Sequence, residues 1–275
     1  MPRVHPLLML LGGLSLACEG AQTSGTIDAL TYNIAGLPEG ISRANPEANT
    51  PRISVRINRY DLVLVQEDFS YHHLLDVAAQ HPYRSAPLTQ FDTLVNDGLN
   101  RFSQFELGPL TRERWPACFG VTDSASDCLS SKGWSLSEVT LAPNVRVHVY
   151  NHHAEAGGGP EDVAARAEGY VRLAEAISEL SEGQAIIVAG DMNLHHDDPE
   201  DEQVLQTFLS ATGLVDACRS LDCGDERIDR FLFRSSDEVE LSALDWAVAE
   251  EMVDDSGAPL SDHLAVFTRF AWAGR

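Results

Sequence analysis

The sequence predicts one domain of the mixed α/β class. Short apolar runs of strand length recur along its 275 residues, a long amphipathic helix pattern lies among them, and no linker after residue 25 divides the chain. Hydrophobic residues make up 44% of the composition and charged residues 22%, which is enough apolar surface to build a core. No central stretch reaches the roughly eighteen apolar residues of a membrane-spanning helix. These features exclude a disordered chain and a polytopic membrane protein.

Seven strands are predicted from the apolar runs, several of which are rich in valine and isoleucine. In chain order they cover residues 27–33, 61–67, 136–142, 145–151, 185–191, 228–233 and 264–270. The clearest helix is predicted over residues 161–182, where apolar side chains keep a helical spacing until Gly183 ends it. Two further helices are predicted near residues 71–80 and 201–212.

The first seventeen residues have the order of charge, apolar core and small residues that is typical of an export signal. Arg3 precedes an apolar run at 7–16, and small residues precede Cys18. This end resembles a bacterial lipoprotein signal, in which Cys18 would carry the lipid and attach the protein to a membrane; a simple cleaved signal and a retained anchor are the alternatives. We therefore expect residues 1–17 to be an export signal, 18–25 a polar tether and 26–275 the folded domain. The exported protein would be a periplasmic or outer-membrane lipoprotein, or secreted.

The cysteines other than Cys18 form an even set, which in an oxidising compartment predicts two disulfides. Among the three connectivities, the short separations favour Cys118 with Cys128 and Cys218 with Cys223. A zinc site is the alternative, although the paired C-x-x-C spacing of such sites is missing.

The charge balance makes nucleic acid the less favoured partner. The chain has 19 basic and 42 acidic residues, a net charge of −23, and Lys132 is its only lysine. Such a field repels polyanions, and a protein that binds nucleic acid through its phosphates needs a basic face. A bound divalent cation can reverse the sign locally, so a nuclease stays open as an alternative.

Polar side chains with metal-binding or acid–base chemistry stand where the predicted strands end or begin. The strand ends carry Asn33, Glu67, His153 and the pair Asp191 and Asn193; Asp229 begins one strand, and Asp262 with His263 precedes the last. Each signal is weak alone. Because such groups are costly to bury, strand ends can deliver them together to one open rim of a sheet. A rim of carboxylate and amide oxygens suits a hard cation such as Mg²⁺ or Ca²⁺.

In their order and spacing, the motifs T-Y-N, Q-E, N-H-H, G-D-M-N, I-D and S-D-H together resemble the endonuclease/exonuclease/phosphatase superfamily of metal-dependent phosphoesterases. The resemblance covers about residues 26–270 and implies a four-layer α/β/β/α sandwich of two mixed sheets flanked by helices, with residues 26–275 as the catalytic domain. It implies Mg²⁺ as cofactor, with Mn²⁺ or Ca²⁺ as alternatives. The implied metal ligands are Asn33 and Glu67, with Asp262 as a further candidate. The implied catalytic residues are His153, Asp191, Asn193, Asp229 and His263.

A phosphoester substrate follows from the resemblance, and the residues around the site bear on which one. The acidic surface favours a zwitterionic substrate, and the D-C-L-S-S-K-G-W stretch looks like the neutral sphingomyelinase branch. We expect a monomeric, exported phosphodiesterase that acts on a phospholipid in the manner of a sphingomyelinase. A nuclease, a phosphatase acting on a small phosphomonoester and an inactive binding module are the alternatives.

Two sets of residues near the predicted rim are open to more than one interpretation. Trp115, Phe119 and Trp134 would either meet a membrane from a disulfide-closed loop or pack on the sandwich. The pair His195 and His196 would either add a metal site or only make the surface polar, and the sequence assigns no role to His152.

Overall fold

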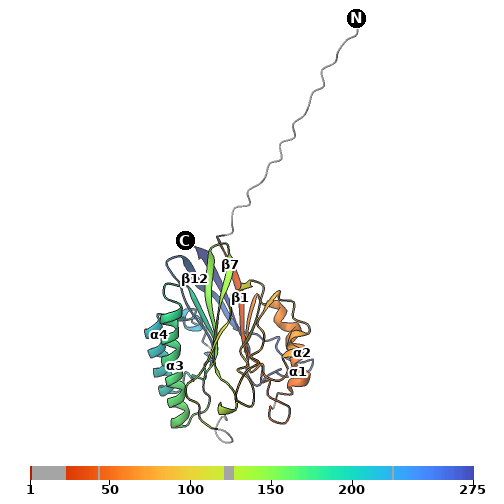
Figure 1. The fold of residues 1–275 in the computed structure, drawn as a ribbon, viewed down its shortest axis with the longest axis vertical. Coiled ribbons are helices and arrows are strands. Elements are labelled where there is room, and N and C mark those ends of the chain that lie inside the picture. Colours follow the sequence, from red (N-terminus) through yellow and green to blue (C-terminus); the bar gives the residue numbers. More distant parts are fainter. Residues whose placement is uncertain (2–22, 43, 121–126, 225) are drawn as a thin grey trace.

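Two mixed β-sheets packed face to face form the centre of the structure (Figure 1). The computed structural model describes residue 1 and residues 23–42, 44–120, 127–224 and 226–275. Over these residues the first sheet has the strand order β12-β13-β1-β2-β4-β3, and the second has the order β10-β11-β9-β8-β7-β5, with β6 paired to β7. The strands of the first sheet are β1 (Ser24–Asn33), β2 (Leu62–Gln66), β3 (Tyr83–Arg84), β4 (Asn100–Ser103), β12 (Val239–Val248) and β13 (Val266–Gly274). Those of the second are β5 (Glu106–Leu107), β6 (Thr111–Arg114), β7 (Gly133–Ala142), β8 (Val145–His153), β9 (Ile186–Asp191), β10 (Val215–Asp216) and β11 (Asp229–Arg234).

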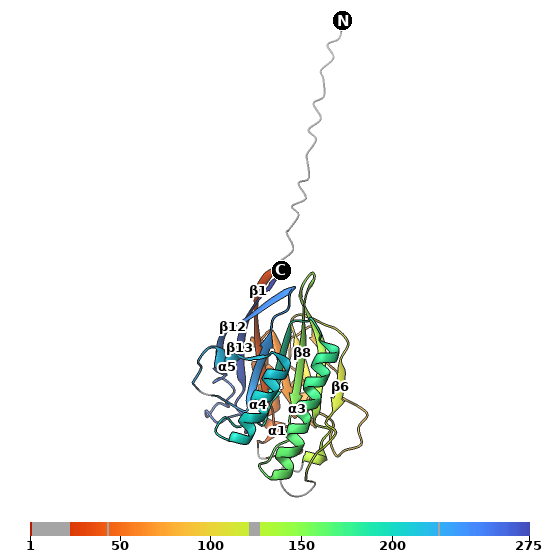
Figure 2. The ribbon, with the colours of Figure 1, turned by 90° about the vertical axis from the view of Figure 1, so that its left-hand side faces the viewer.

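Helices cover the outer face of each sheet, so the layers run helix, sheet, sheet, helix (Figures 1 and 2). The first sheet is covered by α1 (Pro46–Arg56), the 3₁₀ turn η1 (Ile57–Arg59) and α2 (His72–Asp76); the second is covered by α3 (Pro160–Leu180) and α4 (Pro199–Thr212). Short turns of helix are η2 (Asp127–Leu129) and α5 (Ala217–Ser220). This arrangement confirms the expected four-layer sandwich.

Strand alternation explains why three apolar layers form. In β2, Leu62 and Leu64 face the core between the sheets, whereas Val63 and Val65 face α1. Because successive side chains of a strand point to opposite faces, an all-apolar strand buries both of its faces. On the other side of the molecule, Val188 of β9 packs against the helices α3 and α4.

All seven predicted strands form, and the differences lie in the bounds and in elements that the patterns did not indicate. β1 begins at Ser24, inside the expected tether, because Ser24 and Gly25 pair with the end of β13. The helix predicted over residues 71–80 stops at Asp76, since Ala78 instead bonds through its N–H and its carbonyl to side chains of residues 54 and 58. The helix α1 was missed because Pro51 lies inside it. The strand β12 was missed because its mixed, partly exposed sequence is interrupted by a bulge.

The predictions for residues 1–17 and for Cys18 fall almost entirely on residues 2–22, which lie outside the described part of the chain. Within the described part, none of the helices has the length and apolar character needed to cross a membrane.

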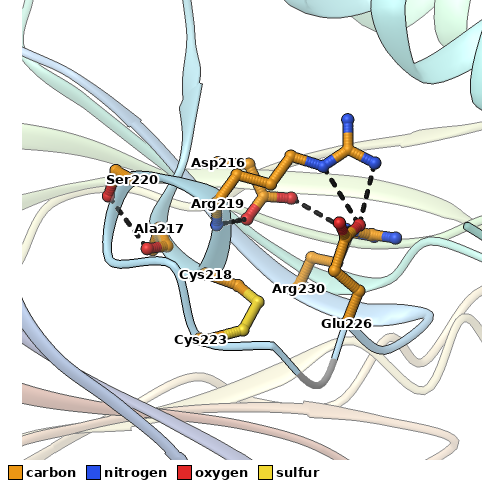
Figure 3. The surroundings of a disulfide bond; sticks show 8 residues. All are labelled: Asp216, Ala217, Cys218, Arg219, Ser220, Cys223, Glu226 and Arg230. Atoms are coloured by element: carbon orange, nitrogen blue, oxygen red, sulfur yellow. Dashed lines mark hydrogen bonds and ion pairs between the residues drawn. A yellow bond between two sulfur atoms is a disulfide. The ribbon is translucent and has the colours of Figure 1, made fainter.

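The four cysteines of the domain form the two expected disulfides, so the zinc alternative is wrong. Cys118 pairs with Cys128 at a Cα–Cα distance of 5.3 Å, and Cys218 pairs with Cys223 at 5.0 Å. The second bond closes the turn after α5, next to a cluster in which Glu226 receives hydrogen bonds from Arg219 and Arg230 (Figure 3).

Opening the first disulfide is expected to destabilise the fold. In the chain-entropy description, a cross-link that closes about ten residues restricts the unfolded chain by about 3 kcal/mol. The double variant Cys118→Ser/Cys128→Ser should therefore lose about that much free energy of unfolding in urea denaturation. A variant as stable as the oxidised wild type would contradict this account.

Candidate active site

The predicted site residues converge at one edge of the sandwich because four strands end there. β1 runs parallel to β2, and β8 runs parallel to β9, so their carboxyl ends meet at that edge. The antiparallel strand β11 begins there, with Asp229 directly opposite Asp191, and His153 pairs with Asp191 from the other side. The turn before β13 brings Asp262 and His263 to the same place.

A pocket of about 680 Å³ opens at this edge. Six of the predicted residues line it: Glu67, His153, Asp191, Asn193, Asp262 and His263. The other two, Asn33 and Asp229, are buried and contact side chains of the lining. The structure therefore brings together all eight residues.

The backbone at the rim adopts conformations that favour glycine. Glu67, Ala35 and Asn193 line the pocket with φ angles of 56°, 50° and 47°. Two glycines allow the chain to approach Glu67 closely: a Cβ on Gly36 would lie 2.4 Å from the Glu67 carbonyl oxygen, and one on Gly98 would lie 2.8 Å from its Cα. Strained residues of this kind cluster at functional sites, where the surrounding structure holds them.

Asn33 connects the two central carboxylates. Its Nδ2 donates to Glu67 Oε1 and to Asp191 Oδ2, both at 3.1 Å, while its Oδ1 accepts from the backbone N–H of Ala35. The amide thereby holds a carboxylate of each sheet at a fixed separation.

Two histidines face the Asp191 carboxylate. Asp191 Oδ2 lies 3.4 Å from His153 Nε2 and 3.6 Å from His263 Nε2. The other nitrogen of His263, Nδ1, lies 2.9 Å from Asp229 Oδ2. His263 therefore stands between two carboxylates, one of which orients the ring.

These contacts set the charges in the site. Burial alone would lower the pKa of His263, but the charges of Asp191 and Asp229 outweigh it and raise that pKa to about 10. Burial alone would raise the pKa of Asp191, but the charge of His263 and the hydrogen bond from His153 hold it well below its usual range. Burial and the charge of Asp191 raise the pKa of Asp229 to about 6. At neutral pH the centre is an imidazolium between carboxylates.

The oxygen atoms of the pocket fit a hard dication. Glu67 and Asp262 border it from the first sheet, and the amide of Asn33 lies behind them. Carboxylate and amide oxygens are the ligands that Mg²⁺ and Ca²⁺ prefer. A second group that could hold a metal ion consists of Asp191, Asp229 and His263, whose potential ligand atoms lie within 4.8 Å of one another. In this group the two ring nitrogens of His263 already face the carboxylates of Asp191 and Asp229. The ion pairs therefore make this second group the less suitable cation site.

A buried polar link behind the pocket joins the two sheets. Gln66 Nε2 donates to Asn151 Oδ1 at 2.7 Å, and Arg101 donates to the carbonyl oxygens of Val149 and Ser135. The sequence did not indicate that Gln66, Asn151 or Arg101 would join the two sheets, because a contact between sheets leaves no local pattern.

Lys132 is the lining residue whose place in the site the sequence reasoning missed. It was noted as the single lysine of the chain and as part of the D-C-L-S-S-K-G-W stretch, yet it is buried and borders the pocket beside His153 and Asn193. The local signal was its position directly before Gly133, where β7 begins.

The aromatic residues of the 115–134 segment largely pack on the sandwich. Trp115 and Trp134 are buried in the layer between the second sheet and its helices, and Trp115 Nε1 donates to the His153 carbonyl at 2.6 Å. Phe119 alone is exposed, at 37%. The structure favours packing over a membrane-facing role for the two tryptophans.

The histidines without an assigned role differ in burial. His195 and His196 are exposed, while His152 is fully buried between the rings of Trp115 and Tyr170. Over the described residues, neither ring nitrogen of His152 has a hydrogen-bond partner. Burial lowers its pKa to about 3, so the ring is neutral.

Replacing His152 with leucine is expected to make the fold less sensitive to acid. The folded protein keeps this ring neutral down to about pH 3, whereas in the unfolded chain it takes up a proton below about pH 6.5. The wild type therefore loses about 1.4 kcal/mol per pH unit from this group as the pH falls through that window. Between pH 7 and pH 4.5 its free energy of unfolding should fall by about 3 kcal/mol more than that of His152→Leu in urea denaturation. Equal losses in the two proteins would count against a buried neutral ring.

Comparisons with known proteins agree with this geometry. Residues 30–263 match the model of the endonuclease/exonuclease/phosphatase family. The sphingomyelinase of Mycobacterium tuberculosis is 34% identical over 263 residues, which cover 87% of this chain and 51% of that protein. The chain thus spans about half the length of the curated relatives it matches.

Two solved structures share the fold. Sphingomyelinase C from Streptomyces griseocarneus has a TM-score of 0.62 at 18% identity, covering 90% of this chain and 99% of that one. TDP2 of D. rerio, in complex with a single-strand DNA product, has a TM-score of 0.66 at 16% identity, covering 89% and 98%. The family match runs from β1 to His263 and so includes the whole pocket lining; the chain belongs to the endonuclease/exonuclease/phosphatase family.

Proposed function

We propose that this protein is an exported, Mg²⁺-dependent phosphodiesterase that hydrolyses a choline phospholipid such as sphingomyelin. The observation that carries the proposal is the convergence of Asp191, His153 and His263 beside the carboxylates of Glu67 and Asp262 in one pocket. Hydrolysis of a phosphodiester loads negative charge onto the phosphoryl oxygens, so the site needs a cation, hydrogen-bond donors and a proton acceptor. The pocket offers residues for each need.

Glu67, Asn33 and Asp262 are the residues that would hold Mg²⁺. When bound there, the ion would neutralise charge on a phosphoryl oxygen. Asp191 Oδ2 orients the attacking water and accepts its proton. The imidazolium of His263, whose Nε2 lies 3.6 Å from that oxygen, donates toward the charge that develops on the phosphoester. His153 and Asn193 donate hydrogen bonds to the phosphoryl group, and Asp229 keeps the His263 ring in place through Nδ1.

Three observations support the lipid substrate and the export. The net charge of −23 disfavours a long polyanion. The relative of 34% identity is a sphingomyelinase, although this chain spans half its length. The two disulfides are typical of proteins in an oxidising compartment, and an export signal at residues 1–17 would place the domain there.

The test is a substrate panel with purified protein and titrated Mg²⁺. Vesicles of sphingomyelin or phosphatidylcholine, plasmid DNA, inositol phosphates and bis-p-nitrophenyl phosphate would be compared, with Asp191→Ala as the inactive control. We expect release of phosphocholine from the vesicles. Plasmid cleavage without lipid turnover would replace the lipid substrate by DNA, and no turnover of any substrate would favour a binding module.

A further inference from the structure

A buried ion pair joins α3 to α4 in a layer of mainly apolar side chains. Arg166 of α3 donates to Asp201 Oδ1, in the first turn of α4, from Nε at 3.0 Å and from Nη2 at 2.6 Å, and each side chain is 2% exposed. Around the pair, the two helices pack on the second sheet through apolar residues. Replacing a buried ion pair by apolar side chains of similar volume is often neutral or stabilising, because the two charges lose their hydration. Stability alone therefore does not account for this pair.

The two side chains also bind the backbone of two loops. Arg166 Nη1 donates to the carbonyl oxygens of Glu155 at 3.0 Å and Gly157 at 2.9 Å, in the loop that follows β8. Asp201 Oδ2 accepts from the N–H of His195 at 3.1 Å, in the loop that follows β9. One carboxylate oxygen thus holds the arginine and the other holds the second loop, so the ion pair connects the two loops.

These loops continue directly from two hydrogen-bond donors of the pocket. His153 lies two residues before the first carbonyl that Arg166 binds, and Asn193 lies two residues before the N–H that Asp201 binds. Both His153 and Asn193 line the pocket. Asn193 Nδ2 also donates to the Ala154 carbonyl at 3.1 Å, so the two loops meet there. A shift of either loop would move one donor relative to the other.

The loop after β8 contains three consecutive glycines, at residues 157–159. Glycine has more backbone freedom than any other residue, and Gly157 has a φ of 84°. Two side chains from the first two turns of α3 hold this loop: Asp162 accepts from the Gly159 N–H at 3.0 Å, and Arg166 binds the Gly157 carbonyl. The helix that follows the loop therefore fixes its backbone.

We propose that Arg166 and Asp201 are positioning residues, whose ion pair fixes the backbone of both loops so that His153 and Asn193 donate to the same phosphoryl group. This inference rests on the proposed phosphodiesterase function and deepens it. Neither Arg166 nor Asp201 lines the pocket, and no bond to either residue forms or breaks.

The kinetic test is the double variant Arg166→Met/Asp201→Leu, which removes both charges and leaves apolar side chains in their place. The full chain would be assayed with Mg²⁺ on bis-p-nitrophenyl phosphate, which separates the chemistry from any binding to membranes. We expect kcat to fall about 10- to 100-fold with a smaller change in KM, since a misplacement of about 1 Å can cost about 10²-fold in rate. The Tm should stay within a few degrees of the wild-type value. A folded double variant that keeps kcat within about twofold of the wild type would overturn the proposal.

Arg172→Met/Glu175→Gln is the matched control, because it removes an ion pair from the same helix at side chains that are 50% and 59% exposed. It should keep the wild-type kcat. A loss in this control as large as that of the buried double variant would show that the effect does not come from the loops, and the proposal would be wrong.

Arg166→Lys decides the matter if the double variant does not fold, because it keeps a positive charge beside Asp201. An ammonium group lacks the planar fork with which Arg166 binds the carboxylate on one side and two carbonyls on the other. We expect kcat to fall at least about threefold, again with a smaller change in KM. A folded Arg166→Lys with the wild-type kcat would contradict the positioning role.

Hydrogen exchange supplies a readout that does not depend on turnover. The N–H groups of Ala154 and Asn193 donate to the carbonyl and the carboxylate of Asp191, at 2.9 and 3.1 Å, and these acceptors remain in the double variant. We expect both amides to exchange at least about tenfold faster in Arg166→Met/Asp201→Leu and at wild-type rates in the control. Equal exchange in wild type and double variant would overturn the positioning role. Faster exchange in the double variant, together with a wild type that cleaves no substrate, would overturn only the hydrolytic function.

Discussion

Asp191→Ala is expected to lower kcat/KM by about 10⁴-fold, the largest effect of any single substitution in the site. The carboxylate receives contacts from Asn33, His153 and His263, so its removal releases three side chains at once and deprives the water of an acceptor. The measurement is phosphodiester hydrolysis together with circular dichroism and thermal unfolding, which should show a folded variant.

Asp197→Ala is the control for this prediction. Asp197 is exposed, lies six residues further along the chain and carries the same charge, so its removal should leave kcat/KM within about twofold. Near-normal turnover by a folded Asp191→Ala would refute the assignment of this carboxylate.

His263→Ala is expected to reduce kcat by about 10³-fold, because removing one preorganised donor that faces the developing charge typically costs about 10² to 10³-fold. The ring is held at Nδ1 by Asp229, so Asp229→Asn should also reduce kcat by loosening the orientation of the ring. The effects of the two substitutions should not add, since both act through the same imidazole.

His195→Ala provides the comparison for His263→Ala, because His195 is exposed and is not among the described residues that line the pocket. It should leave kcat unchanged. A double variant of His263 and Asp229 that loses the product of the two single losses would show that the residues act independently, contrary to this account.

The sequence was most informative where a local pattern has one physical explanation. The apolar run of β2 and the helical spacing in α3 predicted those elements, and polar residues where strands end or begin predicted eight residues that the structure brings together at one pocket. In contrast, α1 contains Pro51, which ordinarily breaks a helix, and so its pattern resembled a loop. Local patterns also do not show which strands of the two sheets lie opposite one another.

The same limit explains why Lys132 was not recognised as a site residue. Its neighbours in space, Ala154 and Asn193, are 22 and 61 residues away along the chain, and only the packing of β7 against β8 and β9 brings them together. Gly36 and Gly98 are each required where the backbone passes close to Glu67. That requirement becomes visible only when the fold is known.

The central claim is that oxygen atoms from Asn33, Glu67 and Asp262, distant in the sequence, form one site for a hard dication. Calorimetric titration of Mg²⁺ into wild type, Glu67→Gln and the surface control Glu175→Gln tests it most directly; Glu175 has a side chain 59% exposed on α3. The account predicts that wild type and control bind Mg²⁺ with the same Kd and that Glu67→Gln binds at least about tenfold more weakly. Absence of Mg²⁺ binding by the wild type, or an unchanged Kd in Glu67→Gln, would contradict it.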